Sequence, residues 1–248
     1  MQQRNTILSL TAILALGTPA CLNVGVYRTA RTLPEGEGDF SMTWSYVRAK
    51  IGKREVTTEV NGQEIVVDEQ PAAIFTYPNL VPELAYHHGV TDDLELGGRL
   101  ALAAGLAELD AKYRFIGSQE SEFHLAVQPA GGYRALGFIE GFSASLPLIA
   151  TYDLSDGISI NAAGFGMFTS FDTSIEDAED NVDFSGKSII AGGSGGIQFR
   201  TSGGFHLMPS VEYQHSLSRS GDAQSLPNIN SLLVGLTLGW GPGRNEAQ

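Results

Sequence analysis

The sequence predicts an all-β fold, an antiparallel up-and-down transmembrane β-barrel of about ten strands. Between residues 94 and 240, short segments with an apolar residue at every second position alternate with clusters of Gly, Ser, Asp and Asn. Side chains on a strand point alternately to its two faces, so each segment forms a ribbon with one apolar and one polar side. In residues 109–115 the polar side carries Asp110, Lys112 and Arg114, which suits a polar lumen inside lipid better than a soluble core.

The composition agrees with a membrane protein that crosses by strands. The 248 residues are 42% hydrophobic with a mean hydropathy of -0.02, and they contain no apolar run of the roughly 20 residues that a membrane helix needs. The 30 glycines are typical of sheets that curve and close. The formal net charge of -13, with no basic cluster in the sequence, argues against a nucleic-acid partner.

Residues 1–20 have the order of parts of a secretory signal peptide. Arg4 precedes an apolar stretch at residues 7–16, which is followed by small and turn-forming residues. The only cysteine, Cys21, comes directly after Ala20, where bacterial lipoproteins carry the cysteine that is lipidated. The two residues before Ala20 depart from the lipoprotein pattern, so cleavage without lipidation is the alternative. A single cysteine excludes a disulfide framework.

The mature chain divides into a tether and a barrel. Residues 21–38 show no periodicity and are expected to form a periplasmic tether, and residues 39–240 are expected to form the barrel. Within the barrel, residues 50–70 hold two β-branched runs around Asn61-Gly62, which predict an exposed surface hairpin. If this hairpin joins the wall, the barrel has twelve strands instead of ten.

Two further segments lie outside the predicted strands. Residues 171–188 are expected to form a long acidic loop, and residues 241–248 a C-terminal tail. The carboxylates of the loop invite a calcium site, but the segment lacks the glycine-turned geometry of an EF-hand, so a solvated surface loop is the expectation. Short turns on one side of the barrel and longer loops on the other are typical of outer-membrane barrels.

Strand parity places a set of polar side chains on the inner face, where they are expected to form a lumen network. Its members are Glu95, Arg99, Asp110, Lys112, Arg114, His124, Gln128, His206, Glu212 and Gln214. Fixed charges of this kind line selective pores for small charged solutes. They also form mutual salt bridges that fill a narrow lumen, and this second interpretation is favoured because facing charges are costly unless paired.

The histidines offer a weak case for catalysis. Their spacing fits no metal site, and neither a metal nor a cofactor is predicted. His206 with Glu212, or His124 with Ser143, has the composition of a hydrolase site. Parity alone puts many polar groups on the inner face, however, and buried polar groups must pair in any narrow barrel, so no catalytic residue is expected.

The whole mature chain resembles a small bacterial (Gram-negative) outer-membrane β-barrel protein, or a lipoprotein form of one. Its last strand resembles the assembly signal read by the barrel-insertion machinery, with Gly235, Leu238 and Trp240 at matching spacing. It departs from that signal at Leu233, where a polar residue is usual, and in the tail that follows the aromatic residue. The resemblance implies an outer-membrane location, contact with outer-membrane lipid, and insertion and periplasmic chaperone machinery as partners, with the oligomeric state left open.

The predicted function is that of a non-catalytic, integral outer-membrane barrel, either structural or a narrow solute passage, with surface loops for binding. Two alternatives belong to other classes. One is a barrel-type hydrolase that modifies lipid. The other is a lipid-anchored soluble β-barrel that binds a small apolar ligand, in which the interior is apolar and the exterior polar.

Overall fold

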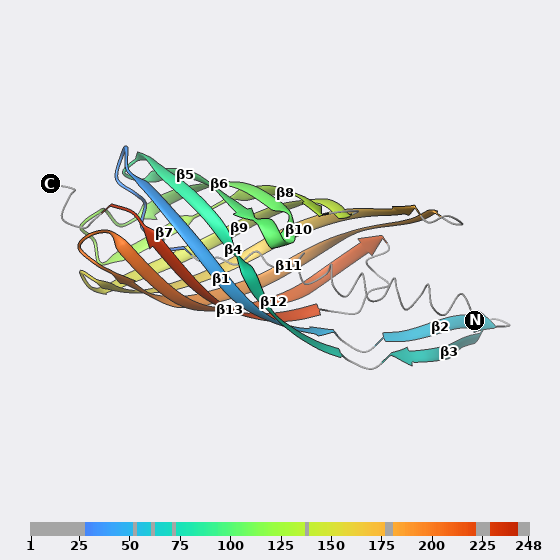
Figure 1. Cartoon of the computed structure of the whole chain (residues 1–248). Coiled ribbons are helices and arrows are strands. Elements are labelled where there is room, and N and C mark those ends of the chain that lie inside the picture. Colours follow the sequence, from blue (N-terminus) through green and yellow to red (C-terminus); the bar gives the residue numbers. More distant parts are fainter. Residues whose placement is uncertain are drawn as a thin grey trace.

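A computed structural model describes residues 28–51, 54–60, 63–70, 73–136, 139–176, 181–221 and 229–242, most of which lie in strands (Figure 1). The wall consists of β1 (Gly38–Ile51), β4 (Ala73–Thr91), β5 (Leu94–Ala101), β6 (Leu106–Ile116), β7 (Phe123–Val127), β8 (Ala130–Leu136), β9 (Ile139–Ser155), β10 (Ile158–Glu176), β11 (Asn181–Arg200), β12 (Phe205–Gly221) and β13 (Ile229–Trp240). A separate hairpin is formed by β2 (Arg54–Val60) and β3 (Gln63–Gln70), and the 3-10 turn η1 (Leu102–Ala104) joins β5 to β6.

The sheet closes on itself between the first and last strands. β1 pairs antiparallel with β13, from Phe40 opposite Trp240 to Ile51 opposite Ile229. β7 and β8 share one position in the wall, because each pairs with β6 on one side and with β9 on the other. Pro129 lies in the break between them, and proline has no N–H to donate to a sheet.

The wall therefore has ten strand positions, which confirms the predicted all-β barrel and its strand number. β2 and β3 pair with each other in a two-stranded sheet of their own and project from the barrel (Figure 1). The twelve-strand alternative is wrong for this reason.

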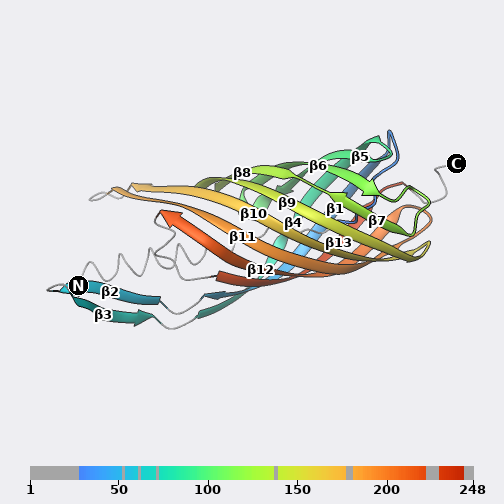
Figure 2. The ribbon, with the colours of Figure 1, turned by 180° about the vertical axis from the view of Figure 1, so that it is seen from behind.

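The connections between strands differ at the two ends of the barrel (Figures 1 and 2). Short turns follow β4, β6, β9 and β11, and the pairing of Phe40 with Trp240 places the start of β1 and the end of β13 at this same end. We call it the short-turn end. At the opposite end, the hairpin end, lie η1, the β2–β3 hairpin and the tip of the long β10–β11 hairpin.

The two faces of the wall have opposite character. Large apolar side chains face outward from every strand position, with Leu109 77% exposed and Tyr113 52% exposed. Their neighbours Asp110, Lys112 and Arg114 are buried on the inner face. No helix in the described part of the chain is long and apolar enough to cross a membrane. An apolar exterior around a polar lumen is the arrangement of a membrane barrel and the inverse of a soluble binding barrel.

Two segments differ from the sequence-based expectation. Residues 28–34, assigned to the tether, enter the lumen at the short-turn end, because their polar groups find partners there. Most of the predicted acidic loop, residues 171–188, is paired strand, since β10 and β11 run side by side as far as Glu176 opposite Asn181. Acidic side chains are compatible with a strand that extends past the rim into water. Cys21 and residues 1–20 lie outside the described residues, as does most of the tail.

The lumen also contains an apolar constriction nearer the hairpin end. The turn at η1 reverses at Gly105, which has a φ of +58°. Small and apolar side chains around this turn pack against residues of β10 and β11, which lie on the opposite side of the ten-strand ring. The cluster consists of Ala101, Ala104, Leu106, Phe165, Met167 and Ile190.

Closure of the wall predicts heat-modifiable migration on a detergent gel. The unheated protein, taken from carbonate-washed outer membranes, should migrate as a compact species, and boiling should shift it to the position of the unfolded chain. The reason is that no strand of a closed barrel has a free edge at which detergent can begin to unfold it. Identical migration before and after boiling, together with extraction by carbonate, would contradict the closed membrane barrel.

Candidate functional site in the lumen

The candidate site is the half of the lumen nearest the short-turn end, where residues 28–34 lie against the inner wall. We call these residues the inserted segment. Its backbone is bound at several points: Ala30 N donates to Thr151 Oγ1 over 2.7 Å, Leu33 N donates to Glu95 Oε2 over 3.1 Å, and Thr29 O accepts from Lys112 Nζ over 3.2 Å. Residues 29, 30, 32 and 33 are all buried. Hydrogen bonds with wall residues thus hold this segment in place, although its sequence has no strand periodicity.

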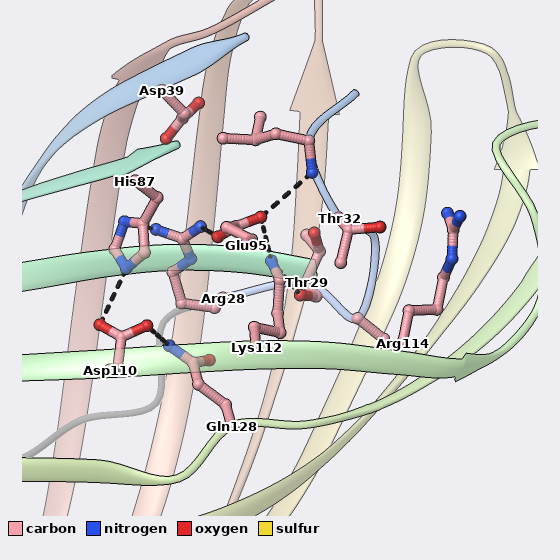
Figure 3. A network of polar contacts seen from close by, with 12 residues as sticks. Arg28, Thr29, Thr32, Asp39, His87, Glu95, Asp110, Lys112, Arg114 and Gln128 are labelled. Carbon is pink, nitrogen blue, oxygen red and sulfur yellow. Dashed lines mark hydrogen bonds and ion pairs between the residues drawn. The ribbon is translucent and has the colours of Figure 1, made fainter. Parts of the chain in front are cut away.

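Glu95 on β5 is the centre of the first anchoring contact. Its side chain is fully buried and forms ion pairs with Arg28 of the inserted segment and with Lys112 of β6, the latter over 3.0 Å. Figure 3 shows the Arg28 guanidinium lying between Glu95 and His87. One carboxylate thus compensates two buried cations, and each of the three charges would be costly alone.

His87 on β4 completes this contact and must be neutral to do so. Arg28 is a donor only, so its hydrogen bond to His87 Nδ1 requires that nitrogen to accept. Nε2 then carries the proton and donates to Asp110 Oδ2 over 3.0 Å, while Gln128 Nε2 donates to the other oxygen of Asp110 over 2.8 Å (Figure 3). The imidazole ring lies against Gly97, where a Cβ atom would collide with it.

Arg31 forms the second anchoring contact on another part of the wall. Its Nε donates to Asp153 Oδ2 on β9 over 2.9 Å, and the same carboxylate lies 3.2 Å from His124 Nε2 on β7. Between the two anchors, Ala30 packs against Ala126 and Ile149. The inserted segment therefore meets the wall through two guanidinium groups with a small apolar residue between them.

A cavity of about 90 Å³ remains between the inserted segment and the β11–β12 side of the wall. Arg28 and Arg31 line it from one side, and Arg200 and His206 line it from the other. His206 Nδ1 lies 3.5 Å from Asp39 Oδ2, which makes a third His–Asp pair in this half of the lumen. The cavity has room for a few water molecules at about 30 Å³ each.

The remaining predicted lumen residues lie elsewhere on the inner wall. Arg99 pairs with Glu83 over 3.3 Å and with Glu108 over 3.0 Å, closer to the hairpin end. Gln214 Nε2 donates to Glu212 Oε1 over 2.6 Å. Arg114 pairs with Asp93 over 2.7 Å at the short-turn rim, where it also donates to the backbone oxygen of Asp92 that accepts from Thr32 of the inserted segment. The polar residues thus form several groups along the inner wall.

The last strand carries the three residues of the predicted assembly signal. Gly235 is buried on the inner face of β13, whereas Leu238 and Trp240 belong to its outer face, with Trp240 48% exposed. The Trp240 ring packs against Phe205, with 5.2 Å between ring centroids. A role for these residues in assembly stays a prediction.

The two catalytic pairs weighed from the sequence are far apart in the structure. His124 is paired in register with Thr151, and Ser143 lies eight residues further along β9, a separation of about 26 Å at the rise of a strand. His206 and Glu212 are six residues apart on β12, or about 20 Å. His124 contacts Asp153 instead, and His206 faces Asp39. Among the described residues, no group of three or more His, Cys, Asp or Glu side chains is arranged to hold a metal ion.

Sequence reasoning missed several residues of the site. His87, Asp153 and Asp39 all follow the inward parity of their strands, since Tyr86, Tyr152 and Phe40 next to them are exposed, and a complete parity assignment would have found them. Arg28 and Arg31 belong to a segment without any period. Their place depends on long-range ion pairs, for which a single sequence carries no local signal.

Replacing Glu95 should destabilise the barrel strongly. Glu95→Ala leaves Arg28 and Lys112 without their shared carboxylate in a buried setting, so the free energy of unfolding should fall by about 3–5 kcal/mol in urea titrations in lipid vesicles. Glu120→Ala, on the exposed turn after β6, is the matched control and should change it by less than about 0.5 kcal/mol. Equal stability of both variants would show that the ion pairs around Glu95 contribute nothing.

Acid should loosen the inserted segment. Protonation of His87 Nδ1 removes the acceptor that Arg28 uses and places two cations in contact, so hydrogen exchange in residues 28–34 should rise as the pH is lowered from neutral, after correction for the intrinsic rate. His87→Gln retains one acceptor and one donor without titrating, and should reduce this rise. An increase of the same size in the variant would exclude His87 as its origin.

The comparisons with known proteins give similarity in structure only. No protein-family model matches the sequence, and no curated protein matches it either. The outer membrane protease OmpT from Escherichia coli is similar in structure, with a TM-score of 0.51 and 8% identity over 87% of this chain and 100% of that one. Neisserial surface protein A has a TM-score of 0.38 and 10% identity over 81% of this chain and 96% of that one. An outer membrane channel from Pseudomonas putida F1 has a TM-score of 0.41 and 12% identity over 89% and 99%.

At 8% identity the similarity to OmpT speaks for the fold and for nothing more specific. It agrees with what the wall shows by itself, a closed antiparallel barrel with an apolar exterior and a polar lumen. The chain has the fold of a bacterial outer-membrane β-barrel, and this fold with its apolar outer face points to the bacterial outer membrane as its location.

Proposed function

We propose that this protein is a sealed, non-catalytic outer-membrane scaffold that presents hairpins at the cell surface for binding. The observation that carries the proposal is that the chain itself fills the lumen at two levels. The inserted segment occupies the short-turn half, and the apolar cluster around η1 spans the lumen nearer the hairpin end. In outer-membrane barrels the short turns face the periplasm, so the hairpin end is the extracellular end.

Of the two roles predicted from the sequence, this filling favours the structural one over a solute passage. A conducting pore needs a continuous aqueous path, and an apolar constriction opposes water and ions even where the gap is not completely filled. The partners implied by the sequence belong to the same proposal: outer-membrane lipid around the wall, and insertion and chaperone machinery during assembly. Binding at the surface is assigned to the β2–β3 hairpin and to the tip of β10–β11.

A non-catalytic role is supported by the placement of the polar residues. The histidines of the lumen lie beside the carboxylates of Asp39, Asp110 and Asp153, in groups engaged with the inserted segment or with the wall. The neighbour OmpT is a protease by name, but at 8% identity its activity does not carry over to this chain.

The sealed lumen predicts that the protein does not conduct. Single insertions into a planar lipid bilayer at neutral pH should give no stable open-channel current. The double variant Leu106→Ala/Phe165→Ala removes two large members of the apolar cluster and serves as the comparison, since it widens one of the two obstructions. Persistent ionic current through the unmodified protein would overturn the sealed scaffold and restore the solute passage.

The projecting hairpin should be dispensable for the barrel. Replacement of residues 54–70 by a short Gly-Ser connection should leave the heat-modifiable migration unchanged, because β2 and β3 pair only with each other among the described strands. The expected change in the free energy of unfolding is below about 1 kcal/mol. Loss of the folded band would mean that the hairpin belongs to the folding unit and is not a surface element.

A further inference from the structure

The inner wall around the inserted segment carries more carboxylates than lysines and arginines. In this half of the lumen the wall contributes four carboxylates, Asp39, Glu95, Asp110 and Asp153, and two cations, Lys112 and Arg200. The formal charges of these six side chains sum to minus two, and Arg28 and Arg31 add two positive charges to them.

The two arginines use separate pockets of different construction. Arg28 contacts two acceptors, His87 Nδ1 and Glu95 Oε1, through different nitrogens of its guanidinium group. Arg31 uses Nε and a terminal nitrogen on one carboxylate, that of Asp153. A planar fork of donors fits both arrangements, whereas the ammonium of lysine offers a single point charge. The pockets are therefore selective for guanidinium groups.

The spacing of the two arginine pockets and the backbone contacts between them fit a short peptide. Two residues, Thr29 and Ala30, separate the arginines, and the chain bends at Ala30. Between them, Lys112 and Thr151 bind main-chain groups of Thr29 and Ala30, and Ala126 and Ile149 leave room for a small side chain. These contacts recognise main-chain groups of the peptide and limit the size of the side chain at one position.

We propose that the periplasmic half of the lumen is a binding site for basic peptides of the pattern Arg-x-Ala-Arg, and that the inserted segment is its internal ligand. A basic segment presented from the periplasm competes with residues 28–34 for the same two pockets. This inference does not depend on whether the lumen is sealed at the η1 level, since the two pockets lie on the short-turn side of that constriction.

The test supplies the peptide in trans. In the full-length variant Arg28→Ala/Arg31→Ala, the tethered segment no longer contributes guanidinium groups and leaves the wall charge uncompensated. A fluorescently labelled peptide Arg-Thr-Ala-Arg-Thr-Leu with blocked ends should bind this variant saturably in fluorescence anisotropy. Its affinity for the unmodified protein should be at least about tenfold lower, because the protein's own segment occupies the site at high effective concentration.

Two controls define the ligand class. The same peptide with citrulline in place of both arginines keeps the shape and loses the charge, and it should not bind. Adding Asp153→Asn to the double variant should weaken binding of the arginine peptide about tenfold or more, since it removes the negative charge of the second pocket. Equal binding of the arginine and citrulline peptides would overturn the proposal.

A second measurement covers the case in which the double variant does not fold. Excess arginine peptide added to the unmodified protein should increase hydrogen exchange in residues 28–34, because displaced backbone amides lose their partners. The citrulline peptide should leave that exchange unchanged. The absence of both displacement here and saturable binding to a heat-modifiable double variant would show that the segment is a fixed part of the wall and that the lumen is no peptide site.

Discussion

Compensation of buried charge is the constraint on which the lumen depends. A narrow barrel takes its inward side chains out of bulk water, and an isolated charge there costs several kcal/mol. Glu95, Lys112 and Asp110 are all buried on adjacent strands. Their charges do not balance through the wall alone, so the chain brings Arg28 and Arg31 to them from outside the strands. The buried carboxylates of the wall therefore need the arginines of the inserted segment as partners.

The wall also limits where its bulky polar side chains can lie. In register, Asp39 on β1 is opposite His87 on β4, His87 is opposite Gly97 on β5, and Gly97 is opposite Asp110 on β6. The glycine gives the imidazole ring a place beside the wall, from which it reaches Asp110 and Arg28 together. A side chain at position 97 would collide with the ring and disturb its contacts with Asp110 and Arg28.

The alternation of apolar and polar residues determined which lumen residues could be predicted from the sequence. The period of two placed Glu95, Lys112 and His124 on the inner face, because every strand of a barrel must turn its apolar side to lipid. It did not reveal their partners, because pairing depends on which strands are neighbours and on register. The acidic stretch of residues 171–188 was assigned to a loop from its charge, although Phe171 and Ile175 share one parity and Asp172, Ser174 and Glu176 the other, in a strand that continues beyond the rim.

The inserted segment lies next to β1 in the chain, but its contacts come from strands further along the sequence. Its first pocket comes from β4, β5 and β6, and its second from β7 and β9, so neither is complete until these strands stand side by side in the wall. Only three residues separate the segment from β1, which closes the barrel against β13. β1 pairs with β4 on its other edge, so its placement carries the segment directly to the rim beside the β4–β5 turn. The neighbouring strands β4 to β9 thus fix the distance between the two pockets, and the short connection to β1 keeps residues 28–34 within reach of both.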